Sequence, residues 1–241
     1  MTGSDVTNKV REQYESLPYP ARNPEDEKNR LLTTFGDDFV RLNQFCFGGN
    51  LDVSNGFRCL VAGGGTGDAA VFLAEQLRNF PSEVVYLDLS ESSQAVARKR
   101  AEVRGLTNIE WITGSLLDVG DLGLAPFDYI SCTGVLHHLA SPEDGLRSLS
   151  AVLKPAGSIL LMLYGKYGRR PVYDMQALLR RFLPPDATIG DQVAGTRSLL
   201  GSLPPSNWFV RDLENWENEI SPGGNGDAGL FDLLLHSQDQ A

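Results

Sequence analysis

The chain has 241 residues, with 21 basic against 31 acidic side chains, which gives a formal net charge of −10. This length indicates one sizeable domain with additions at its ends. Hydrophobic residues at 41% and charged residues at 22% argue against a disordered, collagenous or coiled-coil chain. The acidic balance disfavours a nucleic-acid substrate, because affinity for nucleic acid comes largely from Lys and Arg.

No apolar run approaches the ~20 residues that span a bilayer, and the first 20 residues lack the apolar core of a signal peptide. We therefore expect a cytoplasmic protein with no membrane partner. The cysteines, Cys46, Cys59 and Cys132, are odd in number and lack C-x-x-C spacing. Buried reduced thiols are expected, and no metal site is predicted.

Residues 1–56 are predicted to form a helical N-terminal extension. An amphipathic stretch lies around residues 5–16, followed by the turn-rich segment SLPYPARNP and a predicted helix from about 25 to 46. This segment is a candidate lid over the core.

Residues 57–165 alternate short β-rich runs with helical stretches, as in βαβ units. The predicted strands are 57–62, 83–89, 108–113, 127–132 and 157–164, and the predicted helices are 67–79, 91–104 and 142–153. Uninterrupted apolar strands are typical of a sheet covered by helices on both faces. The predicted fold is α/β, with a doubly wound, mostly parallel sheet.

Residues 166–241 are predicted to form a helical substrate-covering region and a C-terminal tail. Helical patterns occupy 171–182 and about 187–201, and the loop SPGGNGDAG precedes LFDLLLHS, which fits either a strand or a helix.

The strongest chemical signal is an apolar strand that runs into glycines and then directly into a helix. Gly63, Gly65 and Gly67 allow a tight turn and close approach of a ligand. Asp88 follows Gly67 by 21 residues, at the end of the second strand. Doubly wound folds place a ribose-binding carboxylate at this position.

The ordered motifs GGGTG, YLDLS, ITGSLLDV, FDYISCTGVLHHL and LKPAGSILLMLYG resemble a class I S-adenosylmethionine-dependent methyltransferase, across about residues 57–165. The resemblance implies a Rossmann-like methyltransferase fold and S-adenosyl-L-methionine as the methyl donor. A methyl group would pass to a small-molecule acceptor, and S-adenosyl-L-homocysteine would be released.

The resemblance also implies roles for individual residues. Glycines 63, 64, 65 and 67 would cradle the cofactor's methionine and ribose, Asp88 would bind the ribose, and the adenine would lie between two leucines. The implied cofactor-binding set is Gly63, Gly64, Gly65, Gly67, Asp88, Leu89, Ser115, Leu116, Thr133 and Gly134.

Two positions depart from the pattern of many relatives. Val61 replaces an acidic residue before the glycines, and Ser115 replaces an aspartate that accepts from the adenine amino group. Asp68, just after the glycines, is a hypothetical partner for the amino group of the cofactor.

The catalytic residues are unknown at this level, with four candidates. His137 and His138 follow the fourth strand, where ligands bind in open α/β sheets, and either could act as a general base or pack within the loop. Tyr14 or Tyr19 could cover the methyl site, with Arg22 meeting a carboxylate. Alternatively, both tyrosines pack on the sheet edge. Methyl transfer needs little acid–base help when placement is good, since orientation supplies ~7–11 kcal/mol.

No convincing antiparallel strand pair follows Tyr164, although related methyltransferases have one. The alternatives are a naturally shortened edge or a chain cut within a longer protein, and an exposed edge would favour a homodimer. Two other functions stay open: an NAD(P)-dependent oxidoreductase, and a SAM-binding protein without turnover.

Overall fold

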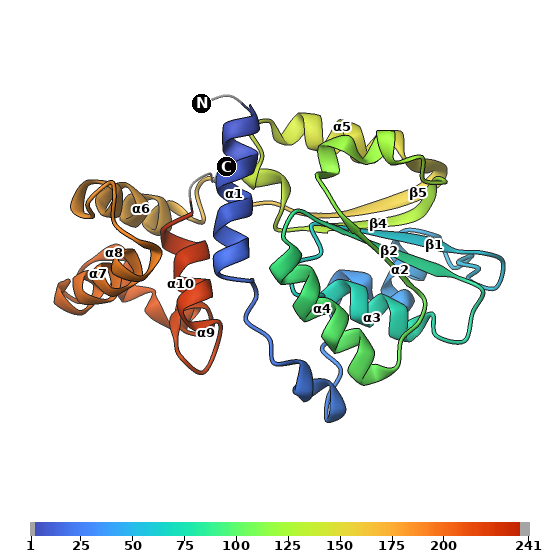
Figure 1. The fold of residues 1–241 in the computed structure, drawn as a ribbon, viewed down its shortest axis with the longest axis horizontal. Helices are drawn as coiled ribbons and strands as arrows, with labels where there is room; N and C mark the ends of the chain where they lie inside the picture. The colour runs from blue at the N-terminus through green and yellow to red at the C-terminus, as the bar shows by residue number, and fades with distance from the viewer. Residues whose placement is uncertain (1–2, 237–241) are drawn as a thin grey trace.

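The computed structural model describes residues 3–236. Its strands are β1 (Arg58–Ala62), β2 (Glu83–Asp88), β3 (Ile109–Thr113), β4 (Phe127–Thr133) and β5 (Leu153–Met162). Its helices are α1 (Gly3–Ser16), α2 (Phe39–Phe45), α3 (Asp68–Gln76), α4 (Glu91–Arg104), α5 (Pro142–Ala151), α6 (Arg170–Phe182), α7 (Ile189–Ser202), α8 (Trp208–Arg211), α9 (Glu217–Ile220) and α10 (Gly226–Leu234). Figure 1 shows the sheet with its helices beside a separate group of C-terminal helices.

The five strands form one parallel sheet in the order β3-β2-β1-β4-β5. Alternate side chains of β1 point to opposite faces, as the two-residue period of a strand requires. Leu60 and Ala62 pack in a core with residues of α5, whereas Cys59 and Val61 pack in a second core with residues of α3 and α4. The predicted doubly wound α/β fold is therefore confirmed.

The strand and helix positions predicted in the core agree with the structure, except at β5. This strand begins at Leu153, four residues before the prediction, and its pairing with β4 shifts register between Phe127 and Tyr129. The motif Leu153–Gly157 thus belongs to the strand, although its Pro and Gly are typical of a turn.

The helix predicted over residues 25–46 is wrong. The structure has two 3-10 turns, Pro24–Lys28 and Phe35–Asp37, and the short helix α2, with residues 30–34 in no regular element. Asn23, just before the segment, accepts from Glu25 N–H and caps the first turn, and Asp38, within the segment, accepts from Arg41 N–H and caps α2. Asn and Asp at such positions start helices. The cap at Asp38 therefore begins a new helix and interrupts the single long helix that was predicted.

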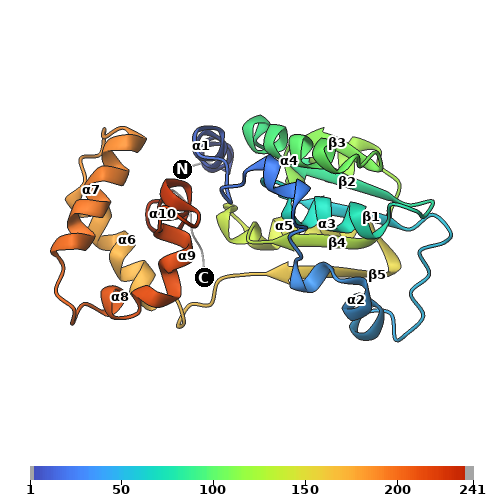
Figure 2. The same cartoon turned by 90° about the horizontal axis from the view of Figure 1, so that it is seen from below.

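The C-terminal helices α6 to α10 form a cap with its own apolar core. Val172, Leu179, Phe209 and Leu230 are buried there, and Leu17, the residue after α1, packs against them. Figure 2 shows α1 between this cap and the helices of the sheet. Of the segment LFDLLLHS, which fitted either a strand or a helix, residues 230–234 lie in α10, and Ser237 lies outside the described residues. Among residues 3–236 no strand follows β5.

Cys59 and Cys132 are buried free thiols, as expected, and burial raises the pKa of Cys132 to about 12. Cys46 is exposed at the end of α2, so the expectation of burial is wrong there. No helix within residues 3–236 combines the length and apolar character needed to cross a membrane.

Candidate cofactor and acceptor site

A cavity of about 640 Å³ lies at the carboxyl ends of the strands, where α/β sheets bind ligands. Every residue of the predicted cofactor set lines it except Gly67, namely Gly63, Gly64, Gly65, Asp88, Leu89, Ser115, Leu116, Thr133 and Gly134. The loops after β1, β2, β3 and β4 therefore meet around one space.

The glycine turn after β1 leaves no room for side chains. Gly65 has a positive φ of 51°, and a Cβ there would lie 2.7 Å from the Tyr19 carbonyl oxygen. A Cβ on Gly64 would lie 2.2 Å from the ring of Tyr86, whose hydroxyl donates to the Gly65 carbonyl. Gly67 has a different position: it is the N-cap of α3 and faces Ala97, outside the cavity wall.

We expect Gly65→Ala to weaken binding of S-adenosylhomocysteine about tenfold or more. A left-handed backbone costs an L-residue roughly 1–2 kcal/mol, and relief of the clash with Tyr19 would shift the turn. Calorimetric titration measures the effect. Gly120→Ala is the matched control, because its Cβ meets nothing within 4 Å and its φ is not positive. Equal affinities of the two variants would contradict the expectation.

Asp88 is held in place by backbone donors at the end of β2. Its Oδ2 accepts the N–H of Gly65 at 2.7 Å, and its Oδ1 accepts the N–H of Ser90 at 2.8 Å. Burial raises the pKa of this carboxyl above its usual value, although the backbone hydrogen bonds act in the opposite direction. The carboxylate is thus fixed beside the glycine turn and faces the cavity.

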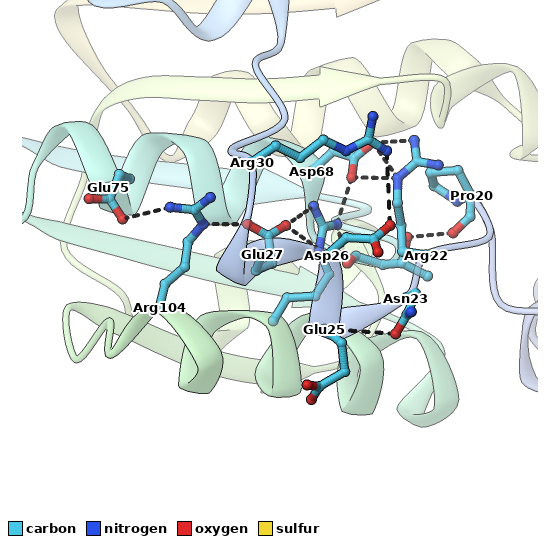
Figure 3. Close-up of polar contacts among 12 residues, drawn as sticks. Pro20, Arg22, Asn23, Glu25, Asp26, Glu27, Arg30, Asp68, Glu75 and Arg104 are labelled. Atoms are coloured by element: carbon cyan, nitrogen blue, oxygen red, sulfur yellow. Dashed lines mark hydrogen bonds and ion pairs between the residues drawn. The ribbon is translucent and has the colours of Figure 1, made fainter.

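Asp68 takes part in an ionic network that ties the N-terminal segment to the core. Its carboxylate pairs with Arg22 at 2.7 Å and with Arg100 at 2.6 Å. Burial acts to raise the pKa of Asp68, but the two guanidinium groups outweigh it and lower the pKa. Figure 3 shows Arg22 against Asp68, with Glu27 and Arg104 further along the network. Asp68 therefore already has two cationic partners beside the cavity.

The segment after α1 lies directly on the glycine turn. The carbonyl of Tyr19 accepts the N–H of Thr66 at 3.3 Å, and the carbonyl of Pro20 accepts its hydroxyl at 2.6 Å. The side chains of Tyr14, Tyr19 and Arg22 line the cavity. The structure places both tyrosines in the cavity wall, which is the arrangement that a covering role requires.

The two histidines after β4 have different environments. His138 lines the cavity, whereas His137 is 1% exposed and does not. The His137 ring stacks on Tyr164 at 3.6 Å, and its Nε2 lies 3.1 Å from Nε2 of His138. Burial, followed by the charges of His138 and Arg169, lowers the pKa of His137 to about 3. His137 is thus a neutral packing residue near pH 7, and His138 is the histidine that can meet an acceptor.

His137→Gln should reduce the loss of stability on acidification. The pKa of His137 is lower in the folded chain than the ordinary 6.5, so unfolding takes up a proton between about pH 6.5 and pH 3. Stability is therefore lost as the pH falls through this window, with a slope of up to ~1.4 kcal/mol per pH unit from this group. Urea unfolding at pH 7, 6 and 5 measures the slope, and an unchanged slope in the variant would contradict the assignment.

Several cavity residues come from the C-terminal cap, and the sequence analysis missed them. Asn218, Glu219, Asn225 and Asp232 line the cavity. They lie more than 50 residues beyond the last recognised motif, in α9, at the N-cap of α10 and in α10. No sequence signal identified them, because the chain must fold back before they reach the site.

Three side chains of metal-ligating types gather beside Tyr14. His138, Asp232 and His236 are all buried, and one potential ligand atom from each lies within 4.8 Å of the others. The rings of His138 and His236 stack at 3.7 Å with an interplanar angle of 14°. A metal lies in the plane of each imidazole that it binds, so two stacked parallel rings cannot share one ion without rotating. The observed arrangement is a packed polar cluster.

Comparison with known proteins agrees with this geometry. Residues 60–159 match the family model of a methyltransferase domain. An uncharacterised protein of Synechococcus, syc1184_c, is 31% identical over 239 residues, which cover 97% of this chain and 55% of that protein. The tRNA 5-carboxymethoxyuridine methyltransferase of Escherichia coli K12 is 35% identical over 112 residues, covering 46% of this chain and 41% of that enzyme. The chain thus spans about half the length of the curated relatives that it matches.

Among solved structures, PKMT2 from Rickettsia typhi in complex with AdoHcy has a TM-score of 0.62 and 22% identity. The match covers 84% of this chain and 39% of that protein. This likeness shows the shared fold, and the family model covers β1 to the middle of β5, including the glycine turn and Asp88. Residues 60–159 therefore form a methyltransferase domain, and its fold is that of the class I S-adenosylmethionine-dependent methyltransferases.

Proposed function

We propose that this chain transfers the methyl group of S-adenosylmethionine to a small acceptor that enters the same cavity from the cap side. The observation that carries the proposal is the junction of two walls in one cavity. The glycine turn, Asp88 and Leu116 form the wall at the sheet, and Tyr14 and Asp232 form the wall at the cap. A cofactor on the first wall would present its methyl group toward the second.

The residues present suit this cofactor. The Asp88 carboxylate can accept from ribose hydroxyls, and the apolar side chains of Leu89 and Leu116 can contact the adenine ring. The ion pair of Arg22 with Asp68 offers both charges to the amino-acid end of the cofactor. S-adenosylmethionine supplies an electrophilic methyl group on a sulfonium. The protein's task is then to orient the acceptor in line with that methyl and to exclude water.

A small acceptor also fits the charge of the cavity. Within the described chain, Arg22 is the sole Lys or Arg in the cavity wall. An RNA or DNA acceptor would bring phosphates, which are bound by several basic side chains. We therefore do not propose for this chain the tRNA substrate of the Escherichia coli relative.

Two alternatives are separable by experiment. A nicotinamide-dependent oxidoreductase would use the same glycine turn and Asp88, but its third motif glycine is replaced by Asp68. A SAM-binding protein without turnover would bind cofactor and release no product. Incubation of the purified chain with S-adenosylmethionine and mixed amine, alcohol, thiol and carboxylate acceptors tests turnover, with S-adenosylhomocysteine release as the readout. Release that depends on an acceptor supports the proposal. Cofactor binding with no release across the mixture would contradict it.

A further inference from the structure

The cap side of the cavity has a marked excess of negative charge. Five carboxylates line the whole cavity against one guanidinium, and they are Asp37, Asp68, Asp88, Glu219 and Asp232. Asp68 forms ion pairs with Arg22 and with Arg100, which lies behind the cavity wall, so its charge is balanced. The carboxylates on the cap side are Glu219 from α9 and Asp232 from α10.

Two tyrosine hydroxyls lie against these two carboxylates. The Tyr14 hydroxyl donates to Asp232 Oδ1 at 2.7 Å, and the Tyr19 hydroxyl donates to Glu219 Oε2 at 2.8 Å. A tyrosine hydroxyl has one proton, so each oxygen can only accept from any further partner. Burial and the nearby carboxylates raise the pKa of both tyrosines, which keeps the hydroxyls neutral. The Asn225 side-chain amide, in the same wall, also donates to Glu219 Oε2 at 2.8 Å. With these donors engaged, the wall offers hydrogen-bond acceptors and negative charge to whatever enters.

An ammonium group is the complement of such a wall, because it carries positive charge and only donates. A carboxylate or phosphate would meet Glu219 and Asp232 with like charge, which costs free energy in a partly buried site. A neutral alcohol would gain hydrogen bonds but no charge complementarity. Resting on the function proposed above, we infer that the acceptor is a primary or secondary amine, and that Tyr14–Asp232 and Tyr19–Glu219 bind it as an ammonium.

The charges balance through the reaction. The bound ammonium R–NH₃⁺ loses a proton, for which the Asp232 carboxylate and the His138 imidazole are the bases at hand. The nitrogen lone pair forms the new N–C bond, the C–S bond breaks, and its electron pair stays on sulfur as the neutral thioether. The product is R–NH₂⁺–CH₃. Positive charge thus moves from sulfur to nitrogen, where the two carboxylates stabilise it in the transition state.

The test compares three probes with the same six-carbon tail: hexylamine, hexanol and hexanoate. Each is titrated at pH 7 into the full chain saturated with S-adenosylhomocysteine. We expect hexylamine, as its ammonium, to bind at least tenfold more tightly than either other probe. With S-adenosylmethionine, mass spectrometry should detect N-methylhexylamine. Ammonium affinity no greater than that of hexanol, including no binding by any probe, would overturn the inference.

Pairs of variants test whether Glu219 and Asp232 cause the preference for hexylamine over hexanol. Glu219→Gln and Asp232→Asn should each reduce the preference for hexylamine over hexanol by about tenfold. Glu217→Gln and Asp227→Asn remove a carboxylate from the same two helices at positions outside the cavity wall, and they should keep the preference. Glu219 lies partly exposed, so its variant stays informative if Asp232→Asn unfolds. A preference that survives in Glu219→Gln contradicts the inference.

Failure of this inference is distinct from failure of the proposed function. A chain that releases S-adenosylhomocysteine with alcohol or carboxylate acceptors, and not with amines, is a methyltransferase whose acceptor class we assigned wrongly. A chain that binds no S-adenosylhomocysteine fails at the earlier step.

Discussion

Asp88→Ala is expected to weaken S-adenosylhomocysteine binding about 10- to 150-fold. Hydrogen bonds to a charged group are worth roughly 1.5–3 kcal/mol, and the ribose would lose its carboxylate partner. In this variant the N–H groups of Gly65 and Ser90 also lose the carboxylate that accepts their hydrogen bonds, so the glycine turn should become less rigid. Calorimetric titration gives the affinity directly.

Asp88→Asn separates these two effects. The amide keeps one oxygen as an acceptor but carries no charge, so we expect a loss smaller than that of the alanine variant. Asp118→Ala is the control, because Asp118 is exposed and does not line the cavity. Wild-type affinity in Asp88→Ala would remove the ribose role from this residue.

Arg100→Ala is expected to lower the free energy of unfolding by about 3–5 kcal/mol, because removing one partner of a buried ion pair leaves the other charge buried and uncompensated. The Arg100 side chain is 1% exposed and pairs with Glu27 at 2.7 Å and with Asp68 at 2.6 Å. It also donates to the Thr66 carbonyl at 2.8 Å. Its removal leaves the Glu27 carboxylate buried, with Arg104 as its remaining cationic partner among residues 3–236.

Thermal unfolding measures this loss. For a chain of 150–250 residues, 1 kcal/mol corresponds to about 2–4 °C, so Tm should fall by about 6–20 °C. Arg147→Ala is the matched control: its ion pair with Asp144 is exposed to solvent, so its loss should change Tm little. Equal Tm shifts in the two variants would show that the buried network does not hold the N-terminal segment on the core.

The core of the fold was predictable from local patterns. Each strand from β1 to β5 is a short apolar run, and each strand-to-helix connection near the cavity has a recognisable turn. The helix predicted over residues 25–46 is wrong because the prediction gave more weight to hydrophobic periodicity than to capping residues. Asn23 and Asp38 accept from backbone N–H groups and start separate turns. A search for capping residues within the segment would have found that break.

The candidate site also has one part that the sequence predicts and one part that it does not. The positions on the sheet side, such as Asp88 and Ser115, follow from their places after strands. Asp232 and His236 were invisible in the sequence, because they reach Tyr14 only through the packing of α10 against α1, more than 200 residues away along the chain. Long-range contacts between a cap and an N-terminal helix have no local signature.

The identity of the cofactor separates a methyltransferase from an oxidoreductase, and a single titration distinguishes them. The purified chain is titrated in a calorimeter with S-adenosylhomocysteine and, in parallel, with NADH. We predict saturable binding of S-adenosylhomocysteine with Kd on the order of micromolar, about −8 kcal/mol, and no binding of NADH. Binding of NADH alone, or of neither ligand, would contradict the assignment of this cavity to S-adenosylmethionine.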